Sequence, residues 1–197
     1  MNLNLSVFYK SNVTDTCAIW NILSSRNLHR AARQAGVTFC CTRFVAYECL
    51  FKPRKTSKVS DNELRGRLQK AQVEADFMEC QLDVADLQTV GLLERRNRLG
   101  KGELSSIALA MKTNQAFMTD DQKARKLGKE VIGNDKVQTT PHLLGWLFFE
   151  GKLLDVDKED IVAEHKRLGG ILEQYYEEVY REAFRCRLMM QQTEKQG

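Results

Sequence analysis

The sequence predicts an α/β protein in which a short parallel sheet is flanked by helices. Three strand-like runs, at residues 12–16, 37–41 and 116–118, alternate with longer segments whose apolar residues recur at helical spacing. Each run is shorter than a typical helix and is apolar or β-branched in character. Strands that alternate with helices are typical of parallel sheets, because the intervening helix carries the chain back to the edge where the next strand begins.

The other elements extend this pattern in chain order. Two more strands are expected, at residues 82–87 and 131–137. Helices are expected at about residues 17–23, 27–35, 42–51, 60–80, 88–98, 103–111, 122–129, 141–150, 158–168 and 170–190. The last two helices follow the sheet, so we expect a domain over residues 1–152 and a C-terminal helical extension over residues 153–197 that packs on the same domain.

Composition excludes several classes of protein. The 30 basic residues exceed the 26 acidic ones by four, which is too small an excess to indicate nucleic-acid binding by itself. Six cysteines lack the C-x-x-C spacing of a zinc site, so we expect reduced, mostly buried thiols. No apolar run approaches the ~18 residues of a membrane span, and no secretory leader is recognised. The prediction is a cytoplasmic protein without a membrane segment.

Acidic residues follow or flank the predicted strands. Asp15 ends the first strand, Glu48 lies in the helix after the second, and Glu103 opens the helix before the third. Asp120 and Asp121 follow that third strand directly. The carboxyl ends of parallel strands share one edge of a sheet, so these side chains can converge there. Neighbouring carboxylates do not all stay ionised without a compensating charge, and Mg²⁺ or Mn²⁺ binds oxygen ligands. The pattern therefore predicts a divalent-metal site.

Each acid also has a simpler structural explanation. Asp15 stands where an N-cap is expected, and N-capping is a common role for Asp. Glu48 lies within an apolar helix, where a glutamate is often salt-bridged or extended to solvent. Glu103 falls in a first helical turn, where a negative charge suits the helix dipole. Both readings stay open for these three residues.

Four segments, taken in order, resemble the motifs of PIN-domain nucleases, including the VapC-like toxins of toxin–antitoxin pairs. The first is Val13–Cys17 (VTDTC), and the second is Tyr47-Glu48 within an apolar helix. The third is Gly102–Ala110 (GELSSIALA) and the fourth is Phe117–Arg125 (FMTDDQKAR). The last two are most similar to the branch of the family with G-E-x-x-x-I-A-L-A and D-D-x-x-A-R motifs. The resemblance spans about residues 11–152.

The resemblance implies a three-layer α/β/α PIN-like fold and an Mg²⁺- or Mn²⁺-dependent endoribonuclease with water as the nucleophile. It implies Asp15, Glu48, Glu103 and Asp121 as catalytic metal ligands, with Asp120 as a further ligand. The T-x-D spacing of the family selects Asp121 over Asp120 as the fourth acid. Glu103 departs from the family pattern, because many PIN toxins have Asp there. RNA, an antitoxin or other protein partner, and a second copy of the chain are the implied partners, in a toxin–antitoxin or defence setting.

Three basic clusters flank the acidic elements, as the walls of a channel for a phosphate backbone should. Solvated surface explains each of them equally well. The candidate phosphate contacts are Lys52, Arg54, Lys55 and Lys58; Arg95, Arg96, Arg98 and Lys101; and Lys123 and Arg125.

Three other functions are compatible with parts of this pattern. A PIN-fold protein that binds nucleic acid or a partner without cleaving is the main alternative. A magnesium-dependent phosphatase or receiver-like domain usually has two close acids after its first strand, whereas Asp15 stands alone here. A purely helical interaction protein is disfavoured by the strand-like runs.

Helix 141–150 is apolar on more than one face, so it is either a deep core helix or a subunit interface. Together with the aromatic terminal helix, it predicts a homo-oligomer.

Overall fold

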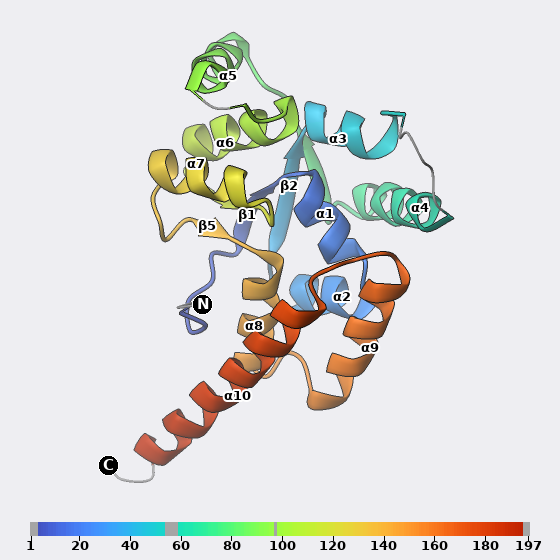
Figure 1. Ribbon diagram of the computed structural model, residues 1–197, viewed down its shortest axis with the longest axis vertical. Coiled ribbons are helices and arrows are strands. Elements are labelled where there is room, and N and C mark those ends of the chain that lie inside the picture. The colour runs from blue at the N-terminus through green and yellow to red at the C-terminus, as the bar shows by residue number, and fades with distance from the viewer. Residues whose placement is uncertain (1–3, 54–58, 97, 195–197) are drawn as a thin grey trace.

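The computed structural model describes residues 4–53, 59–96 and 98–194. The described residues form a five-stranded parallel sheet in the order β3-β2-β1-β4-β5 (Figure 1). The strands are β1 (Ser11–Thr14), β2 (Thr38–Thr42), β3 (Phe77–Cys80), β4 (Ala116–Met118) and β5 (Val137–Gln138). The predicted α/β class with a short parallel sheet is confirmed.

Side chains alternate between the two faces of the sheet and so supply two cores. Phe39, Cys41 and Met118 belong to one core, whereas Cys40 and Phe117 belong to the other. The first core is covered by α1 (Thr16–Leu23), α2 (Arg26–Gln34), α3 (Arg43–Leu50), α4 (Val59–Val73), α8 (Thr140–Phe149), α9 (Asp155–Arg167) and α10 (Glu173–Glu194). The second is covered by α5 (Val84–Arg96), α6 (Lys101–Thr113) and α7 (Gln122–Ile132). The predicted three-layer α/β/α arrangement is confirmed.

The central strand determines where the acidic segments meet. Val13 of β1 stands opposite Cys40 of β2 on one side and Phe117 of β4 on the other. The three strands therefore end level with one another. The segments that follow them begin at Asp15, Arg43 and Thr119, and they leave the sheet at the same edge.

The region from residue 73 to residue 87 differs from the prediction. The helix expected over 60–80 ends at Val73, and the next strand is β3, so a strand over 82–87 is wrong. Ala75 has a φ of 60°, in the left-handed region that ends a helix. Asp83 and Asp86 each accept a hydrogen bond from the other's backbone N–H, at 2.9 and 2.8 Å, and this reciprocal cap starts α5.

A smaller error concerns the last strand. Val131 and Ile132 were expected to be extended, but they form the last turn of α7, and β5 contains only Val137 and Gln138. The apolar pattern of α7 continues through both residues, because they pack against the second core. A β-branched pair at a helix end is therefore a poor signal for a strand here.

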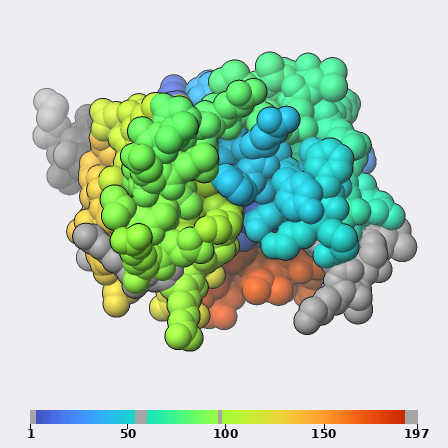
Figure 2. All heavy atoms as spheres, turned by 90° about the horizontal axis from the view of Figure 1, so that it is seen from above, coloured from blue at the N-terminus to red at the C-terminus, as the bar shows by residue number. Residues whose placement is uncertain are grey.

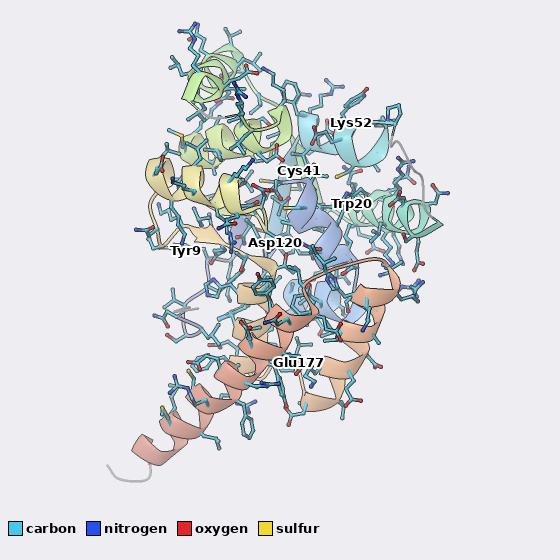
Figure 3. The ribbon with its side chains drawn as sticks, in the orientation of Figure 1. Tyr9, Trp20, Cys41, Lys52, Asp120 and Glu177 are labelled. Atoms are coloured by element: carbon cyan, nitrogen blue, oxygen red, sulfur yellow. The ribbon has the colours of Figure 1, made fainter. Side chains whose placement is uncertain are left out.

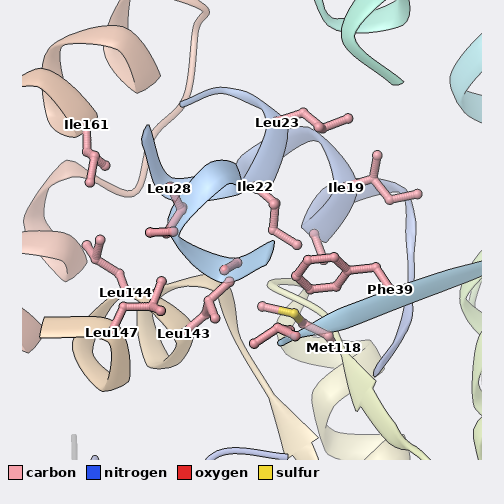
Figure 4. Packing of buried hydrophobic residues seen from close by; sticks show 14 of the residues in the cluster. Ile19, Ile22, Leu23, Leu28, Phe39, Met118, Leu143, Leu144, Leu147 and Ile161 are labelled. Carbon is pink, nitrogen blue, oxygen red and sulfur yellow. The ribbon is translucent and has the colours of Figure 1, made fainter. Parts of the chain in front are cut away.

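The apolar helix α8 is a core helix, which decides between the two explanations left open by its sequence. Its leucines pack against Ile22, Leu28 and Ile161 (Figure 4). Gly145 brings the backbones close together, because a Cβ atom there would lie 2.8 Å from Leu5 Cδ2 and 3.1 Å from Val179 Cβ of α10. The buried α8 therefore gives no support to the homo-oligomer, which stays a prediction.

The C-terminal helices share the first core with the sheet. His165 of α9 is buried, and its two ring nitrogens contact the Ser24 hydroxyl at 2.6 Å and the Leu172 N–H at 3.1 Å. Burial lowers the pKa of His165 to about 4, so the ring is neutral at pH 7. Since the Leu172 N–H donates to Nε2, Nδ1 carries the proton that is donated to Ser24. In the described part of the chain, no helix is long and apolar enough to cross a membrane.

Candidate active site

Asp15 is the most enclosed of the predicted site residues. Its carboxylate is 1% exposed and accepts hydrogen bonds from the Ala18 N–H at 2.9 Å, the Cys17 thiol at 3.0 Å and the Thr119 hydroxyl. The bond from Ala18 makes Asp15 the N-cap of α1, as the simpler explanation expected. The other two donors come from the site itself, so capping is only part of its role.

Burial gives Asp15 unusual acid–base behaviour. Desolvation raises the pKa of Asp15 from 3.8 to about 7, although the hydrogen bonds from Cys17, Thr119 and Ala18 act in the opposite direction. Desolvation and the neighbouring charges of Asp15 and Asp120 also raise the pKa of Cys17 far above its ordinary value, so its thiol stays neutral and donates. A buried carboxylate of this kind is stabilised in its charged form by a nearby cation.

Glu48 leaves α3 toward the same edge and is held by two donors. Its Oε2 accepts from the Thr16 hydroxyl and its Oε1 from the Lys52 ammonium, both at 3.0 Å. Its carboxylate also lies against Gly102, where a Cβ atom would come within 2.6 Å of Oε2. The salt-bridged explanation of Glu48 is therefore correct as a description of its pairing. The hydrogen bond from Thr16 also joins Glu48 to the residue that directly follows Asp15.

Glu103 lies in the first turn of α6 and is half-buried. Its side chain folds back over the start of the helix, where a Cβ atom on Gly100 would stand 2.5 Å from Glu103 Oε2. Its charge contributes to the raised pKa of Lys52, after the larger effects of Glu48. The Lys52 ammonium therefore sits in the field of two of the four acids implied as ligands.

The adjacent acids after β4 have different environments. Asp120 (labelled in Figure 3) is half-buried and accepts from the Thr140 N–H at 2.9 Å, the Thr140 hydroxyl at 2.6 Å and Asn21 at 2.8 Å. Both of its oxygens are thus engaged in joining the β4 loop to α1 and α8. Asp121 is exposed and caps α7 through the Ala124 N–H at 2.8 Å. Which of the two acids is the fourth ligand stays a prediction, as does the T-x-D argument for Asp121.

The predicted site with five ligands is not assembled in this conformation. Across residues 4–53, 59–96 and 98–194, no three His, Cys, Asp or Glu side chains stand close enough to hold one ion. Lys52 occupies one oxygen of Glu48, and Thr140 and Asn21 occupy those of Asp120. The buried Asp15 carboxylate and the exposed Asp121 still provide the oxygen donors that Mg²⁺ and Mn²⁺ prefer. The donor chemistry fits a divalent cation, and ligation by all of these acids stays a prediction.

The residues of the predicted basic clusters differ in pairing and exposure. Lys52 is paired with Glu48, and Lys101 with Glu94 at 2.6 Å. Exposed side chains are those of Arg95, Arg98 and Lys123. Arg125 is half-buried, and its charge lowers the pKa of Asp120 slightly against a larger effect of burial. Residues Arg54, Lys55 and Lys58 and the side chain of Arg96 lie outside the described residues.

Several residues around the acids were not anticipated. Cys17 contacts Asp15 and also accepts from the Asp120 N–H at 3.3 Å, so its thiol joins two of the acidic segments. Its place two residues after Asp15 was the only sequence signal. Asn21 and Thr140 lie 99 and 20 residues from Asp120 in the sequence, and no spacing rule connects them.

Acidic residues follow or flank the carboxyl ends of the parallel strands in this three-layer α/β/α fold. We call this edge of the sheet, with Asp15, Glu48, Glu103, Asp120 and Asp121, the acidic edge. The model of the PIN domain family matches residues 13–130, which is more than half of the chain and contains all five acids. The chain therefore belongs to the PIN domain family, whose members are generally metal-dependent nucleases. None of the curated proteins matches the chain.

Gly102→Ala is expected to slow the cleavage of nucleic acid, although it replaces none of the acidic residues. The new Cβ would lie 2.6 Å from Glu48 Oε2 and 3.4 Å from Val45 Cγ2, so the Glu48 carboxylate must move. Misplacing a group that supports a metal site costs about 10- to 100-fold. Alanine also suits a helix interior better than glycine by ~1 kcal/mol, so the melting temperature should not fall on that account.

The matched control for this variant is Gly91→Ala in α5, where a Cβ meets no atom within 4 Å. Cleavage rates and melting temperatures of both variants would be measured side by side. Full cleavage by Gly102→Ala would show that the position of Glu48 does not matter to the reaction.

Lys52→Met is expected to tighten Mn²⁺ binding. The Lys52 ammonium is the cation paired with Glu48, so its removal frees one carboxylate oxygen for a metal. Lys52 is 57% exposed, and exposed ion pairs contribute little, so we expect a gain of about two- to fivefold. Calorimetric titration with Mn²⁺ measures the change, with Lys101→Met as the control because that lysine pairs with Glu94. Unchanged or weaker binding by Lys52→Met would mean that the ammonium does not compete with the metal.

Proposed function

We propose that this PIN-domain protein is a divalent-metal-dependent endoribonuclease that hydrolyses phosphodiester bonds at the Asp15 edge of the sheet. One observation carries the proposal: a buried carboxylate with a pKa of about 7 stands at the carboxyl end of the central strand, where burial and, to a smaller extent, the charge of Asp120 raise that pKa. A buried acid with a perturbed pKa is a common sign of a functional site.

The residues of the site have separate roles in this proposal. Asp15 is the anchor, because its donors Ala18, Cys17 and Thr119 hold its carboxylate in one orientation. Asp121 follows β4 and Glu48 lies in α3, and both are proposed to join Asp15 at the metal. Glu103 adds negative charge at the start of α6.

A bound Mg²⁺ or Mn²⁺ would supply Lewis-acid polarisation of the phosphodiester and a more acidic water. Asp15, Glu48, Glu103 and Asp121 are the residues that would hold it. Asp120 keeps the β4 loop in place through Thr140 and Asn21. The exposed cations Arg98 and Lys123 are proposed to contact the phosphate backbone.

The proposed substrate is RNA, and the proposed setting is a toxin–antitoxin or defence system in the cytoplasm. Both rest on the resemblance of the four motifs to VapC-like toxins. An antitoxin or other partner protein and a homo-oligomer belong to the same proposal.

The test is incubation of the purified protein with end-labelled single-stranded RNA and DNA in Mg²⁺, Mn²⁺ or excess chelator. We expect internal cleavage of RNA that chelator stops and added Mn²⁺ restores. Failure to cleave any RNA with either metal would overturn the proposal.

A second candidate is a PIN-fold protein that binds nucleic acid without cleaving it. The salt bridge between Lys52 and Glu48 favours this candidate, because a lysine ammonium can neutralise an acidic pocket without any metal. The same incubation separates the two candidates. RNA that is bound but stays intact in Mn²⁺ would favour the second.

A further inference from the structure

An apolar groove lies beside the acidic edge, between α3, β3 and α5. It has a volume of about 750 Å³ and is lined by Arg43, Phe44, Tyr47, Phe51, Leu82 and Leu87, among others. Its volume falls within the ~300–1,000 Å³ typical of small-ligand sites. Viewed from above, α3 (cyan) lies uncovered beside the green helices α5 and α6 (Figure 2).

Two aromatic rings form an exposed pair on this side of α3. Tyr47 and Phe51 are one helical turn apart, their rings are 6.4 Å apart at 28°, and they are 54% and 68% exposed. Aromatic side chains usually dominate protein cores, so two stacked rings left in water indicate a binding surface.

The groove is continuous with the acidic edge through α3. Tyr47 and Glu48 are consecutive residues, and Tyr47 lines the groove while Glu48 contacts Thr16 and Gly102. A cation lies on each side of the two rings: Arg43, at the start of α3, is 76% exposed and 3.6 Å from Glu79 of the groove lining, and Lys52, two residues after α3, is 57% exposed and pairs with Glu48. The rings therefore lie between two exposed ion pairs, and one of these pairs includes the proposed ligand Glu48.

We propose that this groove is a stacking site for an unpaired base of a single-stranded RNA, next to the phosphate that is cleaved. The inference rests on the proposed function and specifies its substrate class. Binding of single strands combines ring stacking with cations that contact the phosphates, and α3 provides both. An A-form duplex keeps its bases stacked within the helix and has no free base to offer to Tyr47 and Phe51. Arg43 and Lys52 are paired with Glu79 and Glu48, but exposed ion pairs contribute little, so a phosphate can replace either carboxylate as their partner, which favours a phosphate chain over an apolar protein segment as the occupant.

The experiment measures binding without cleavage, in the Asp15→Asn background and in chelator. The probes are a fluorescent single-stranded oligoribonucleotide and the same chain with abasic sites, which has identical phosphates but no bases. We expect the abasic chain to bind roughly tenfold more weakly, as stacking on aromatic side chains predicts. Tyr47→Ala and Phe51→Ala should remove this difference, and Tyr47→Phe should restore it. Phe184→Ala, at an exposed ring on α10, is the matched control and should leave the difference intact.

Two results would overturn the inference. Equal affinity for intact and abasic chains, in a protein that cleaves RNA, would show that the groove takes no base while the nuclease proposal survives. A wild-type dimer at micromolar concentration that Tyr47→Ala dissociates would assign the groove to a second copy of the chain. Base-dependent binding that needs Tyr47, in a protein that cleaves nothing with Mg²⁺ or Mn²⁺, would support the stacking site and overturn only the nuclease proposal.

Discussion

Asp15→Asn should lower metal-dependent RNA cleavage by more than ~100-fold, because loss of even a supporting residue of a metal site costs about 10- to 100-fold. The carboxylate is the buried anchor of the acidic edge, and asparagine replaces a charged oxygen by an amide nitrogen. Cleavage rates of wild type and variant in Mn²⁺ give the result. Asp120→Asn is the matched control, because Asp120 holds Thr140 and Asn21 and is assigned to the structure of the loop. If Asp15→Asn and Asp120→Asn lowered the cleavage rate equally, the two acids would not have the separate roles proposed for them.

The fold of Asp15→Asn is expected to survive, because asparagine is also a good N-cap for α1. The pKa of Asp15 rises from 3.8 to about 7 in the folded protein, so protonated Asp15 favours the folded state. That contribution is complete below about pH 4 and is lost as the pH rises toward 7. Each pKa unit corresponds to about 1.4 kcal/mol, so the loss is on the order of 4 kcal/mol. In chelator, the melting temperature of wild type should therefore fall relative to that of Asp15→Asn between pH 4 and pH 8. If the melting temperatures of the two proteins changed with pH in parallel, burial would not have raised the pKa of Asp15.

Tyr176→Ala is expected to destabilise the whole domain by about 3–5 kcal/mol, as truncation of a large core aromatic does. Tyr176 of α10 is fully buried, and its ring centroid lies 4.8 Å from that of His165. It belongs to the same core as the sheet residues Phe39 and Met118. Urea unfolding should therefore show one transition at lower urea concentration, because the C-terminal helices and the sheet unfold together.

Two controls make this prediction specific. Within the described residues, the buried hydroxyl of Tyr176 has no hydrogen-bond partner, so Tyr176→Phe should leave stability unchanged or raise it. Tyr175 is 44% exposed, and Tyr175→Ala should change stability by less than ~1 kcal/mol. A separate early transition of the C-terminal helices in Tyr176→Ala would show that residues 153–197 are not part of the cooperative unit.

The sequence predicted the central strands better than the segment between residues 73 and 87. β1, β2 and β4 are short buried runs, and burial on both faces gives parallel strands a recognisable apolar character. β3 is a strand at the edge of the sheet, and Met78 and Glu79 are exposed, so the apolar signal is weak. The end of α4 depends on a left-handed Ala75, a conformation that non-glycine residues rarely adopt and that composition does not reveal.

Asp15, Asp120 and Asp121 follow β1 and β4, as the strand pattern predicted, whereas their membership of one site with Glu48 and Glu103 stays a prediction. Their individual partners depend on long-range packing, which one sequence does not encode in any local pattern. The pairing of Asp120 with Asn21 joins residues 99 positions apart, and that of Glu48 with Thr16 joins residues 32 apart. The pairing of Glu48 with Lys52 is an i, i+4 contact, so helical spacing could have identified it. Lys52 was assigned to phosphate contact from its position in a basic cluster.

The most direct test of the metal-dependent nuclease proposal is to locate Mn²⁺ by anomalous scattering in crystals of the wild-type protein. We expect an ion that contacts the Asp15 carboxylate and at least one of Glu48, Glu103 and Asp121, with Lys52 displaced from Glu48. An ion bound elsewhere, or the salt bridge between Lys52 and Glu48 intact at saturating Mn²⁺ with no ion at Asp15, would contradict it.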